Sequence, residues 1–324
     1  MKKKKSYDYA RFGYIFSIPF VVAWCIFQLY PILYTLVIGF TDLKGIGTKN
    51  FHVLWTTPFA NFTQILTTPS FQTAFKNTVF IWLMNFVPQI VLALVITAWF
   101  TDRRSTIKAQ GFFKVIFYLP NIITAATVAI LFAQFFQYPK GVINDVLINL
   151  GIFKNGAVDM LQKKWVAQGI VIFIQTWMWY GYTAIVMISG VLGISPELFE
   201  AAEVDGANQV QTFFRITIPS IKTMLLFTLV TSLIGGLNMF DIPKLFLNGK
   251  PDNSTLTTAV FIYNQAFAGS YLYNRAAAAS VIMFIVIVVL SAIVFYLLRD
   301  KDEVALRKLI RQQEKAYKRK QKGL

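Results

Sequence analysis

The sequence predicts an all-α transmembrane protein whose chain crosses the membrane six times. Of its 324 residues, 56% are hydrophobic and only 14% are charged, whereas soluble domains carry about 25% charged residues. Six strongly apolar runs without a charged residue are each long enough to cross the hydrocarbon core, which takes roughly 20 helical residues. Lys and Arg gather on one side of these runs, as they do in membrane proteins. The composition excludes a disordered chain, a collagen-like chain and a coiled coil.

The six predicted spans are rich in Ile, Val, Leu and Phe, and each is too apolar to be a loop in water. The lysines before the first run resemble the start of a signal peptide, whose apolar region has about 7–15 residues. This run is much longer, so we expect it to remain as the first helix. The runs cover residues 12–41, 77–101, 115–139, 165–196, 223–240 and 276–298.

A seventh uncharged stretch, residues 256–274, is expected to form an interfacial or partly buried helix outside the cell. It contains Asn264, Gln265 and Asn274 and is more polar than the six runs. A seventh span would also separate the two termini and move the basic C-terminal tail out of the cell, against the usual distribution of Lys and Arg.

The distribution of Lys and Arg predicts the orientation. Of the 31 basic residues, 21 fall on the side that holds both termini, and the positive-inside rule places that side in the cytoplasm. The chain is therefore expected to comprise a basic cytoplasmic arm at 1–11, a six-span membrane domain at 12–298 and a basic cytoplasmic tail at 299–324. The net charge of +16 then reflects topology and attraction to anionic lipid, and we expect no nucleic-acid binding.

The residues that most catalytic and metal sites need are almost absent. Cys25 is the only cysteine and His52 the only histidine, so an internal disulfide and a cysteine-based metal site are excluded. The glycine-rich stretch 45–49 lacks the spacing of a phosphate-binding loop and is predicted to lie outside the cell. We expect neither a catalytic residue nor a metal site on this chain.

The predicted cytoplasmic loop at 191–222 differs from the other loops. Ser195 and Pro196 suit the cap and the first position of a short helix, and Gly206 is expected to end it, because glycine readily adopts a positive φ. A second helix is expected at about 207–217. The first helix carries apolar side chains near one face and acids near another, which predicts that a partner packs there.

At these residues the sequence resembles the Glu-Ala-Ala loop of permeases of ATP-binding-cassette (ABC) importers. The only departure is an isoleucine where the family usually has leucine, and the Asp-Gly-Ala that follows is similar to the carbohydrate branch, with its maltose-type and glycerol-phosphate-type permeases. The likeness in span number and loop size extends over nearly the whole chain. The matching pattern is Glu200-Ala201-Ala202, three residues, Gly206, nine residues, Ile216, one residue, and Ile218-Pro219.

This resemblance implies a type I ABC importer permease in a bacterial cell membrane, with a cytoplasmic coupling helix. The implied partners are a homologous second permease, two ATPase subunits and an extracellular solute-binding protein, besides membrane lipid. ATP and Mg²⁺ would bind the ATPase, so this chain would be a transport subunit and not an enzyme. Glu200 would anchor the helix, the alanines would permit close approach, and Gly206 would make the bend. The residues assigned to coupling are Leu198, Phe199, Glu200, Ala201, Ala202 and Gly206.

The resemblance to the carbohydrate branch implies a di- or oligosaccharide as the substrate, with a glycerol-phosphate-type solute as the alternative. The lack of a charged cluster in the spans argues against a highly charged substrate. A sugar site needs hydrogen-bonding groups and aromatic planes together, and polar groups inside spans face the bundle interior or a water-filled cavity. Asn85 and Gln89 are expected to be satisfied amides, and Gly235-Gly236 a close-packing surface. The residues expected in the substrate pathway are Gln175, Trp177, Tyr180, Asn238, Phe240 and Asp241.

Two other classes of protein remain as alternatives. A secondary transporter working without ATP would show inverted repeats or an intramembrane charge relay, and neither is visible in the sequence. A membrane-embedded enzyme would need a constellation of His, Cys or paired carboxylates in its spans, for which the residues are missing. Trp and Tyr near span ends are also common as interface residues, which is the alternative role of Trp177 and Tyr180.

Overall fold

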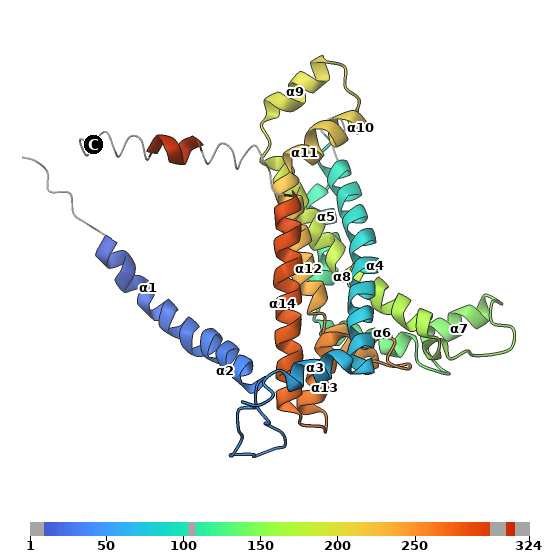
Figure 1. Ribbon diagram of the computed structural model, residues 1–324. Helices are drawn as coiled ribbons and strands as arrows, with labels where there is room; N and C mark the ends of the chain where they lie inside the picture. Colours follow the sequence, from blue (N-terminus) through green and yellow to red (C-terminus); the bar gives the residue numbers. More distant parts are fainter. Residues whose placement is uncertain (1–9, 103–107, 299–308, 315–324) are drawn as a thin grey trace, which may run out of the picture. The chain divides into compact units, whose positions relative to one another are not determined.

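The computed structural model describes residues 10–102, 108–298 and 309–314. These ranges are helical apart from their connecting loops and one isolated antiparallel bridge between Thr41 and Val53 (Figure 1). The chain divides into two compact units. The predicted cytoplasmic arm and most of the predicted cytoplasmic tail lie outside the described residues.

The first unit comprises the chain up to Gln72 together with Phe261–Ile285. Its N-terminal helix is formed by α1 (Ala10–Trp24), a π-helical segment η1 (Cys25–Leu29) and α2 (Tyr30–Ile38), which follow one another without a break. Of these residues, 27 form a candidate membrane span, and they coincide with the first predicted run. Nearly all of its large side chains are exposed within this chain.

A pair of buried asparagines fixes the loop that follows α2. Asn61, in α3 (Ala60–Thr67), donates through Nδ2 to the carbonyl oxygens of Gly39 at 2.9 Å and Thr41 at 2.8 Å. Asn274, in α14 (Tyr273–Leu298), donates through its own Nδ2 to Oδ1 of Asn61 at 2.9 Å. Because buried amides are costly unless bonded, this arrangement specifies how the loop, α3 and the start of α14 pack.

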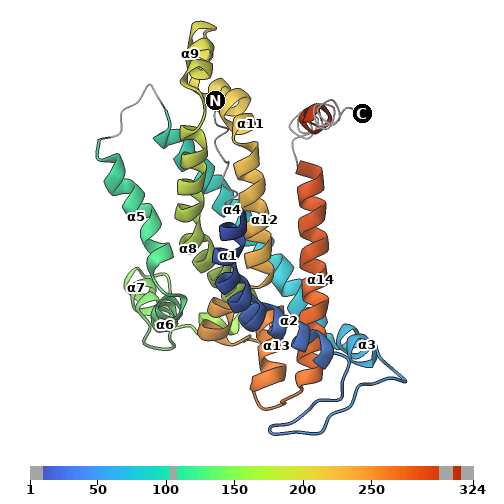
Figure 2. The same ribbon diagram turned by 90° about the vertical axis from the view of Figure 1, so that its left-hand side faces the viewer.

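The second unit comprises Thr73–Val260 and the chain from Val286 onward. Figures 1 and 2 show α4, α8 and α12 running alongside one another, with α9 beyond one end of them. Two helices, α13 (Thr258–Phe267) and α14, are shared with the first unit, and α4 begins there. The remaining elements are α4 (Pro69–Phe100), α5 (Gln110–Ile122), α6 (Ala125–Phe135), α7 (Val142–Asn149), η2 (Met160–Gln162), α8 (Lys164–Leu192), α9 (Pro196–Val204), α10 (Gln209–Thr212), η3 (Phe213–Thr217), α11 (Ile218–Ser220), α12 (Lys222–Leu237) and η4 (Pro243–Leu247).

Four described helices are long and apolar enough to cross a membrane alone, and two bent pairs bring the number to six if each pair is one span. The predicted span at 115–139 is one such pair, because α5 and α6 meet at 85°. Ile123 is extended there, and the hydroxyl of Thr124 caps α6 by accepting from the N–H of Thr127. The second pair bends by 68°, at Ile221 between α11 and α12.

The more polar stretch at 256–274 contains a helix of only 10 residues, α13. A helix of this length is about half as long as a membrane crossing requires. The structure therefore agrees with the expectation that this stretch does not span the membrane.

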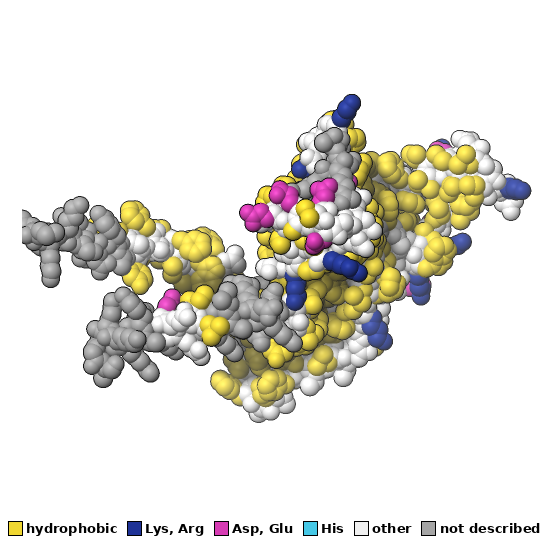
Figure 3. All heavy atoms as spheres, turned by 90° about the horizontal axis from the view of Figure 1, so that it is seen from above, with side chains coloured by type: hydrophobic (Ala, Val, Ile, Leu, Met, Phe, Trp, Pro, Cys, Tyr) yellow, Lys and Arg dark blue, Asp and Glu magenta, His cyan; other side chains and the backbone are white. Residues whose placement is uncertain are grey.

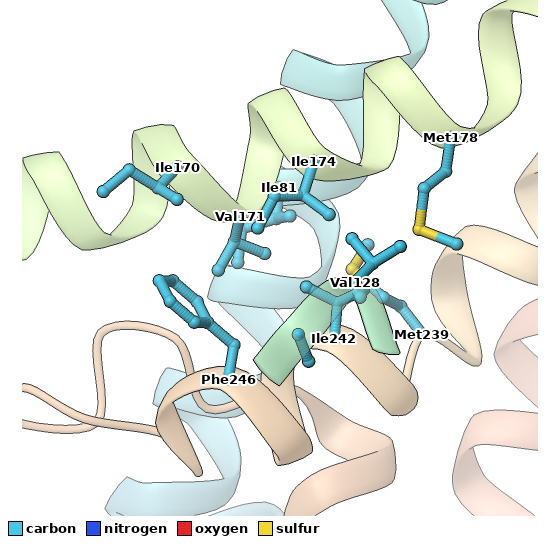
Figure 4. Close-up of a cluster of buried hydrophobic side chains, with 10 residues drawn as sticks. Ile81, Val128, Ile170, Val171, Ile174, Met178, Met239, Ile242 and Phe246 are labelled. Carbon is cyan, nitrogen blue, oxygen red and sulfur yellow. The ribbon is translucent and has the colours of Figure 1, made fainter. Parts of the chain in front are cut away.

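The core of the second unit lies where α8 crosses α4 and α6. Ile81 of α4, Val128 of α6 and Ile174 of α8 are fully buried, and Figure 4 shows their side chains directed towards one another. Ile242 and Phe246, from the segment after α12, pack into the same cluster. This cluster fixes α8 against α4, and α8 consequently provides one wall of the cavity described next.

Candidate functional site

A cavity of about 380 Å³ lies in the second unit and is lined by α4, α8, α12 and the turn that follows α12. Its volume falls in the range of small-molecule sites, about 300–1,000 Å³. Its lining combines indole and phenol rings with amide, hydroxyl and carboxyl groups. Such a wall can bind a ligand that has both polar edges and apolar faces.

One face of α8 supplies a wall of the cavity. The lining residues of α8 lie three, four, seven and eight positions after Gln175, a pattern that places side chains on one face of a helix. They are Gln175, Met178, Trp179, Tyr182 and Thr183. The rings of Trp179 and Tyr182 meet edge to face, with 5.9 Å between their centroids. Both side chains are partly exposed and offer flat surfaces beside hydrogen-bonding groups.

The amides that α4 contributes to the wall are bonded, as expected. Asn85 donates through Nδ2 to the carbonyl oxygen of Ile81 at 2.9 Å. Gln89 donates through Nε2 to the hydroxyl of Thr183 at 2.8 Å and so joins α4 to α8. Both amides nevertheless border the cavity, where their oxygen atoms are available to a ligand.

The face of α12 contributes hydroxyl groups and two glycines. Thr228, Thr231, Ser232, Gly235 and Gly236 line the cavity, again at helical spacing. The hydroxyl of Thr228 is buried and has no hydrogen-bond partner among the described residues. Because this oxygen is buried, a ligand in the cavity would supply its missing partner only if the wall opened towards it.

Four of the six residues predicted for the substrate pathway line the cavity. Gln175 lies on α8, and the other three follow the end of α12, where the chain turns towards η4. The four are Gln175, Asn238, Phe240 and Asp241. That they contact a substrate remains a prediction.

The structure does not place Trp177 and Tyr180 at the cavity. They lie on the opposite face of α8 from Gln175, because each residue of a helix turns it by about 100°. Trp177 packs against Phe132 with ring centroids 6.1 Å apart. Tyr180 meets Phe117 of α5 at 6.2 Å. Both aromatic side chains therefore serve the packing of α5 and α6 onto α8.

Sequence reasoning missed Trp82, Trp179, Thr228 and Ser232 as lining residues. Their signal was present, because polar and aromatic side chains recur every three or four residues on each of the three helices. One polar residue in a span does not reveal a site, whereas several on one face of a helix do.

Asp241 is the only acidic or basic residue among the described residues that line the cavity. It is exposed and lies in the turn between α12 and η4. Lys244, one helical turn further along the chain, is half-buried in η4 and is not part of the lining. The wall that this chain contributes is thus uncharged apart from this carboxyl group.

The predicted coupling loop forms a short helix with two different faces. Phe199 and Ala202 lie on the inner face of α9, and Ala202 is only 5% exposed. The outer face carries Leu198, Glu200 and Ala201, all of them exposed. Figure 3 views the molecule from the end where α9 lies and shows acidic side chains gathered there beside hydrophobic ones. Of the two alanines predicted to permit close approach of a partner, Ala201 faces outward and Ala202 is buried.

The inner face of α9 is joined to the helices that line the cavity. Phe199 packs against a buried cluster of Met187 and Val191, at the end of α8, and Ile221, at the start of α12. A small cavity of about 60 Å³ also lies between α9, the end of α4 and the segment Gln209–Thr217. Phe199 therefore connects α9 directly to the end of α8 and the start of α12.

Two details of this loop differ from the predictions. Ser195 occupies the cap position of α9, but its side chain makes no capping hydrogen bond. The second helix begins and ends two to three residues later than expected, because α10, η3 and α11 run from Gln209 to Ser220. Its start is fixed by an unpredicted capping box between Asn208 and Gln211. Gly206 adopts the expected positive φ of 74°.

Comparisons with known proteins agree with these features. Residues 77–301 match the family described as the binding-protein-dependent transport system inner membrane component. The chain is 31% identical to the lactose transport system permease protein of Rhizobium radiobacter over 92% of this chain and 97% of the relative. It is 28% identical to the arabinooligosaccharides transport system permease protein of Bacillus subtilis, over 86% of each chain. The fold is similar to that of a chain in a solved structure, the bacterial alginate ABC transporter in complex with an alginate pentasaccharide-bound periplasmic protein. The TM-score is 0.71 and the sequence identity is 25%. The match covers 90% of this chain and 96% of that chain.

Proposed function

Because the chain belongs to the family of binding-protein-dependent transport system inner membrane components, we propose that it is a permease subunit of an ATP-driven sugar importer. It moves a di- or oligosaccharide from an extracellular binding protein into the cytoplasm. The observation that carries the proposal is the cavity between α4, α8 and α12, whose wall joins aromatic rings to hydrogen-bonding groups. The sugar-transporting relatives support the same substrate class.

The chemistry of the wall suits a neutral sugar. Trp179 and Tyr182 offer aromatic planes for the apolar faces of a pyranose ring, and Gln175 and Thr228 offer hydrogen bonds to its hydroxyl groups. A glycerol-phosphate-type solute is less well supported. None of the described residues in the lining is a Lys or Arg that would pair with a phosphate, and Asp241 would repel one.

The outer face of α9 supports a docking role. Glu200 and Ala201 are exposed there beside the apolar side chain of Leu198, which is the combination that an electrostatically anchored helix needs in a partner's cleft. The partner is a cytoplasmic ATPase, which holds ATP and Mg²⁺ and carries out hydrolysis. Two such ATPases serve this chain and a homologous second permease.

Transport then follows from the connection between α9 and the cavity. ATP binding draws the ATPases together and displaces α9. Through Phe199, that displacement moves α8 and α12, whose faces line the cavity. The cavity opens outward to receive sugar from the extracellular binding protein, and hydrolysis returns it to the inward state. Packed helices of this kind favour two discrete arrangements over gradual deformation.

A direct test is ATP-dependent uptake of labelled sugars by proteoliposomes that contain the complete importer and its binding protein. We expect uptake of at least one neutral di- or oligosaccharide, dependent on ATP inside the vesicle and on the binding protein outside. Uptake that persists without ATP would favour a secondary transporter. Uptake of phosphate-bearing solutes alone would exclude the sugar assignment.

A further inference from the structure

We propose that the contact between Trp82 of α4 and Gly236 of α12 sets the width of the cavity and thereby the size of the sugar that the pathway accepts. This inference rests on the proposed function and adds two specificity-determining residues to it. Gly236 leaves space for the indole ring of Trp82, and the indole forms part of the cavity wall.

Trp82 is held in one orientation by three neighbours. Its indole Nε1 donates to the hydroxyl of Ser232 at 3.3 Å. Phe86, one turn along α4, stacks on the indole with ring centroids 5.9 Å apart and an interplanar angle of 24°. The indole is only 9% exposed, and the surface it does present borders the cavity. A ring fixed in this way forms a firm wall.

The third neighbour is Gly236, one helical turn after Ser232. A Cβ atom on Gly236 would overlap Cδ1 of the indole and would lie 2.7 Å from Cγ and 2.8 Å from Nε1. These separations are shorter than any that two carbon atoms in van der Waals contact adopt. Gly236 lies inside α12 and needs no positive φ, so the close approach of the indole is what requires a glycine here.

A side chain at Gly236 would therefore displace the indole. Phe86 occupies one face of the ring and α12 lies against its pyrrole edge, whereas the cavity is open space. The ring would move into the cavity and narrow it. A narrower cavity excludes large sugars before small ones, because steric rejection grows with the size of the ligand.

The adjacent Gly235 supplies a matched control. It also lines the cavity and also lies in α12, but a Cβ atom on Gly235 would meet nothing within 4 Å. The substitutions Gly235→Ala and Gly236→Ala therefore make the same chemical change in neighbouring positions of one helix. They differ in the contact with Trp82.

The experiment measures kcat/KM for uptake of a series of neutral mono-, di-, tri- and tetrasaccharides by the complete reconstituted importer. For Gly236→Ala we expect kcat/KM of the largest transported sugar to fall about tenfold or more, while the smallest changes little. Gly235→Ala adds the same methyl group without moving the indole, so its loss of kcat/KM for the largest sugar should be several-fold smaller. Trp82→Phe, which removes bulk from the wall, should shift preference towards larger sugars. The double variant Gly236→Ala with Trp82→Leu should regain the large sugars.

Assembly of each variant with its ATPase is measured in parallel by co-purification. Equal size profiles for Gly235→Ala and Gly236→Ala would overturn the inference, and so would a Gly236→Ala defect that is equal for all sizes and is not relieved in the double variant. If the wild-type importer transports no sugar at all, it is the proposed function that fails.

Discussion

Thr228 is a cavity-lining residue whose hydroxyl has an unusual environment. Its hydroxyl is buried in the face of α12 and has no partner among the described residues. Leaving a buried hydroxyl unbonded costs about 1–3 kcal/mol. The neighbouring Thr231 bonds instead to the carbonyl oxygen of Phe227 at 2.8 Å. Of the two threonines, Thr228 is therefore the one whose hydroxyl would gain a hydrogen bond from a ligand for which the cavity wall opens.

Replacing the hydroxyl of Thr228 with a methyl group is therefore expected to weaken substrate binding without weakening the fold. For Thr228→Val we expect KM for sugar uptake to rise about five- to tenfold, the loss of a single hydrogen bond. The thermal stability of the purified protein should stay equal or increase. The control, Thr231→Val, should leave KM near the wild-type value. Equal KM values for the two variants would contradict a ligand role for Thr228.

Asp241 is expected to govern selection by charge. It is the only charged residue among the described lining residues, and like charges brought together in a binding site are strongly disfavoured. In Asp241→Asn, inhibition of neutral-sugar uptake by the corresponding uronate should become about tenfold stronger, while uptake of the neutral sugar stays within about threefold. The reverse change, Asn238→Asp, should weaken inhibition by the uronate. Unchanged inhibition in both variants would show that this carboxylate does not face the substrate.

At the scale of elements, the proposed docking face of α9 is distinct from the face that anchors the helix. The outer residues Leu198, Glu200 and Ala201 are exposed, whereas Phe199 is packed against Met187 and the ends of α8 and α12. Changes on the two faces should therefore have different consequences, even though the residues are neighbours in sequence.

Reversing the charge on the docking face is expected to prevent association with the ATPase. For Glu200→Lys we expect ATP-driven uptake to fall about tenfold or more, because like-charge contacts at an interface cost several kcal/mol. The protein should still insert into the membrane. Glu197→Lys makes the same change one turn earlier and should have the smaller effect. Normal co-purification of the ATPase with the Glu200→Lys variant would argue against α9 as the docking helix.

Removing the anchor should instead separate ATP hydrolysis from transport. In Phe199→Ala the ATPase should still co-purify and hydrolyse ATP, but the number of sugars transported per ATP should fall several-fold, since the contact that moves α8 and α12 is lost. The matched variant Leu198→Ala should weaken association with the ATPase and leave that ratio unchanged. A normal ratio in Phe199→Ala would exclude this route of coupling.

The elements also show what a single sequence can and cannot predict. Uncharged runs located every long helix, because a membrane-spanning helix must be apolar along its length. The 85° bend after α5 falls at Ile123 and Thr124, just beyond Pro120, a residue type that kinks helices, but the sequence does not give the angle. The sequence also does not show which face of each helix is directed towards the cavity. Trp177 and Trp179 differ in role only because they point in different directions from α8, and tertiary packing decides which direction is inward.

For the whole molecule, the helices of membrane-spanning length differ in how much of their surface this chain buries. Half of the apolar window of α8 is buried within this chain, against 6% for the N-terminal span and 6% for α14. A soluble protein could not leave such helices uncovered. Apolar side chains exposed to this extent fit an inner membrane component, the family to which this chain belongs.

The predicted topology, with both termini and α9 in the cytoplasm, can be tested directly because the chain has a single cysteine. In a Cys25→Ser background, a new cysteine is placed at Lys49, in the loop between α2 and α3, or at Val204 at the end of α9. Both positions are exposed, and Val204 is 89% exposed. In intact cells treated with a membrane-impermeant maleimide, Lys49→Cys should be labelled at once, and Val204→Cys only after the membrane is permeabilised. These outcomes follow from the excess of Lys and Arg on one side of the spans. Labelling of Val204→Cys from outside would reverse the orientation and, with it, remove α9 from the reach of any cytoplasmic ATPase.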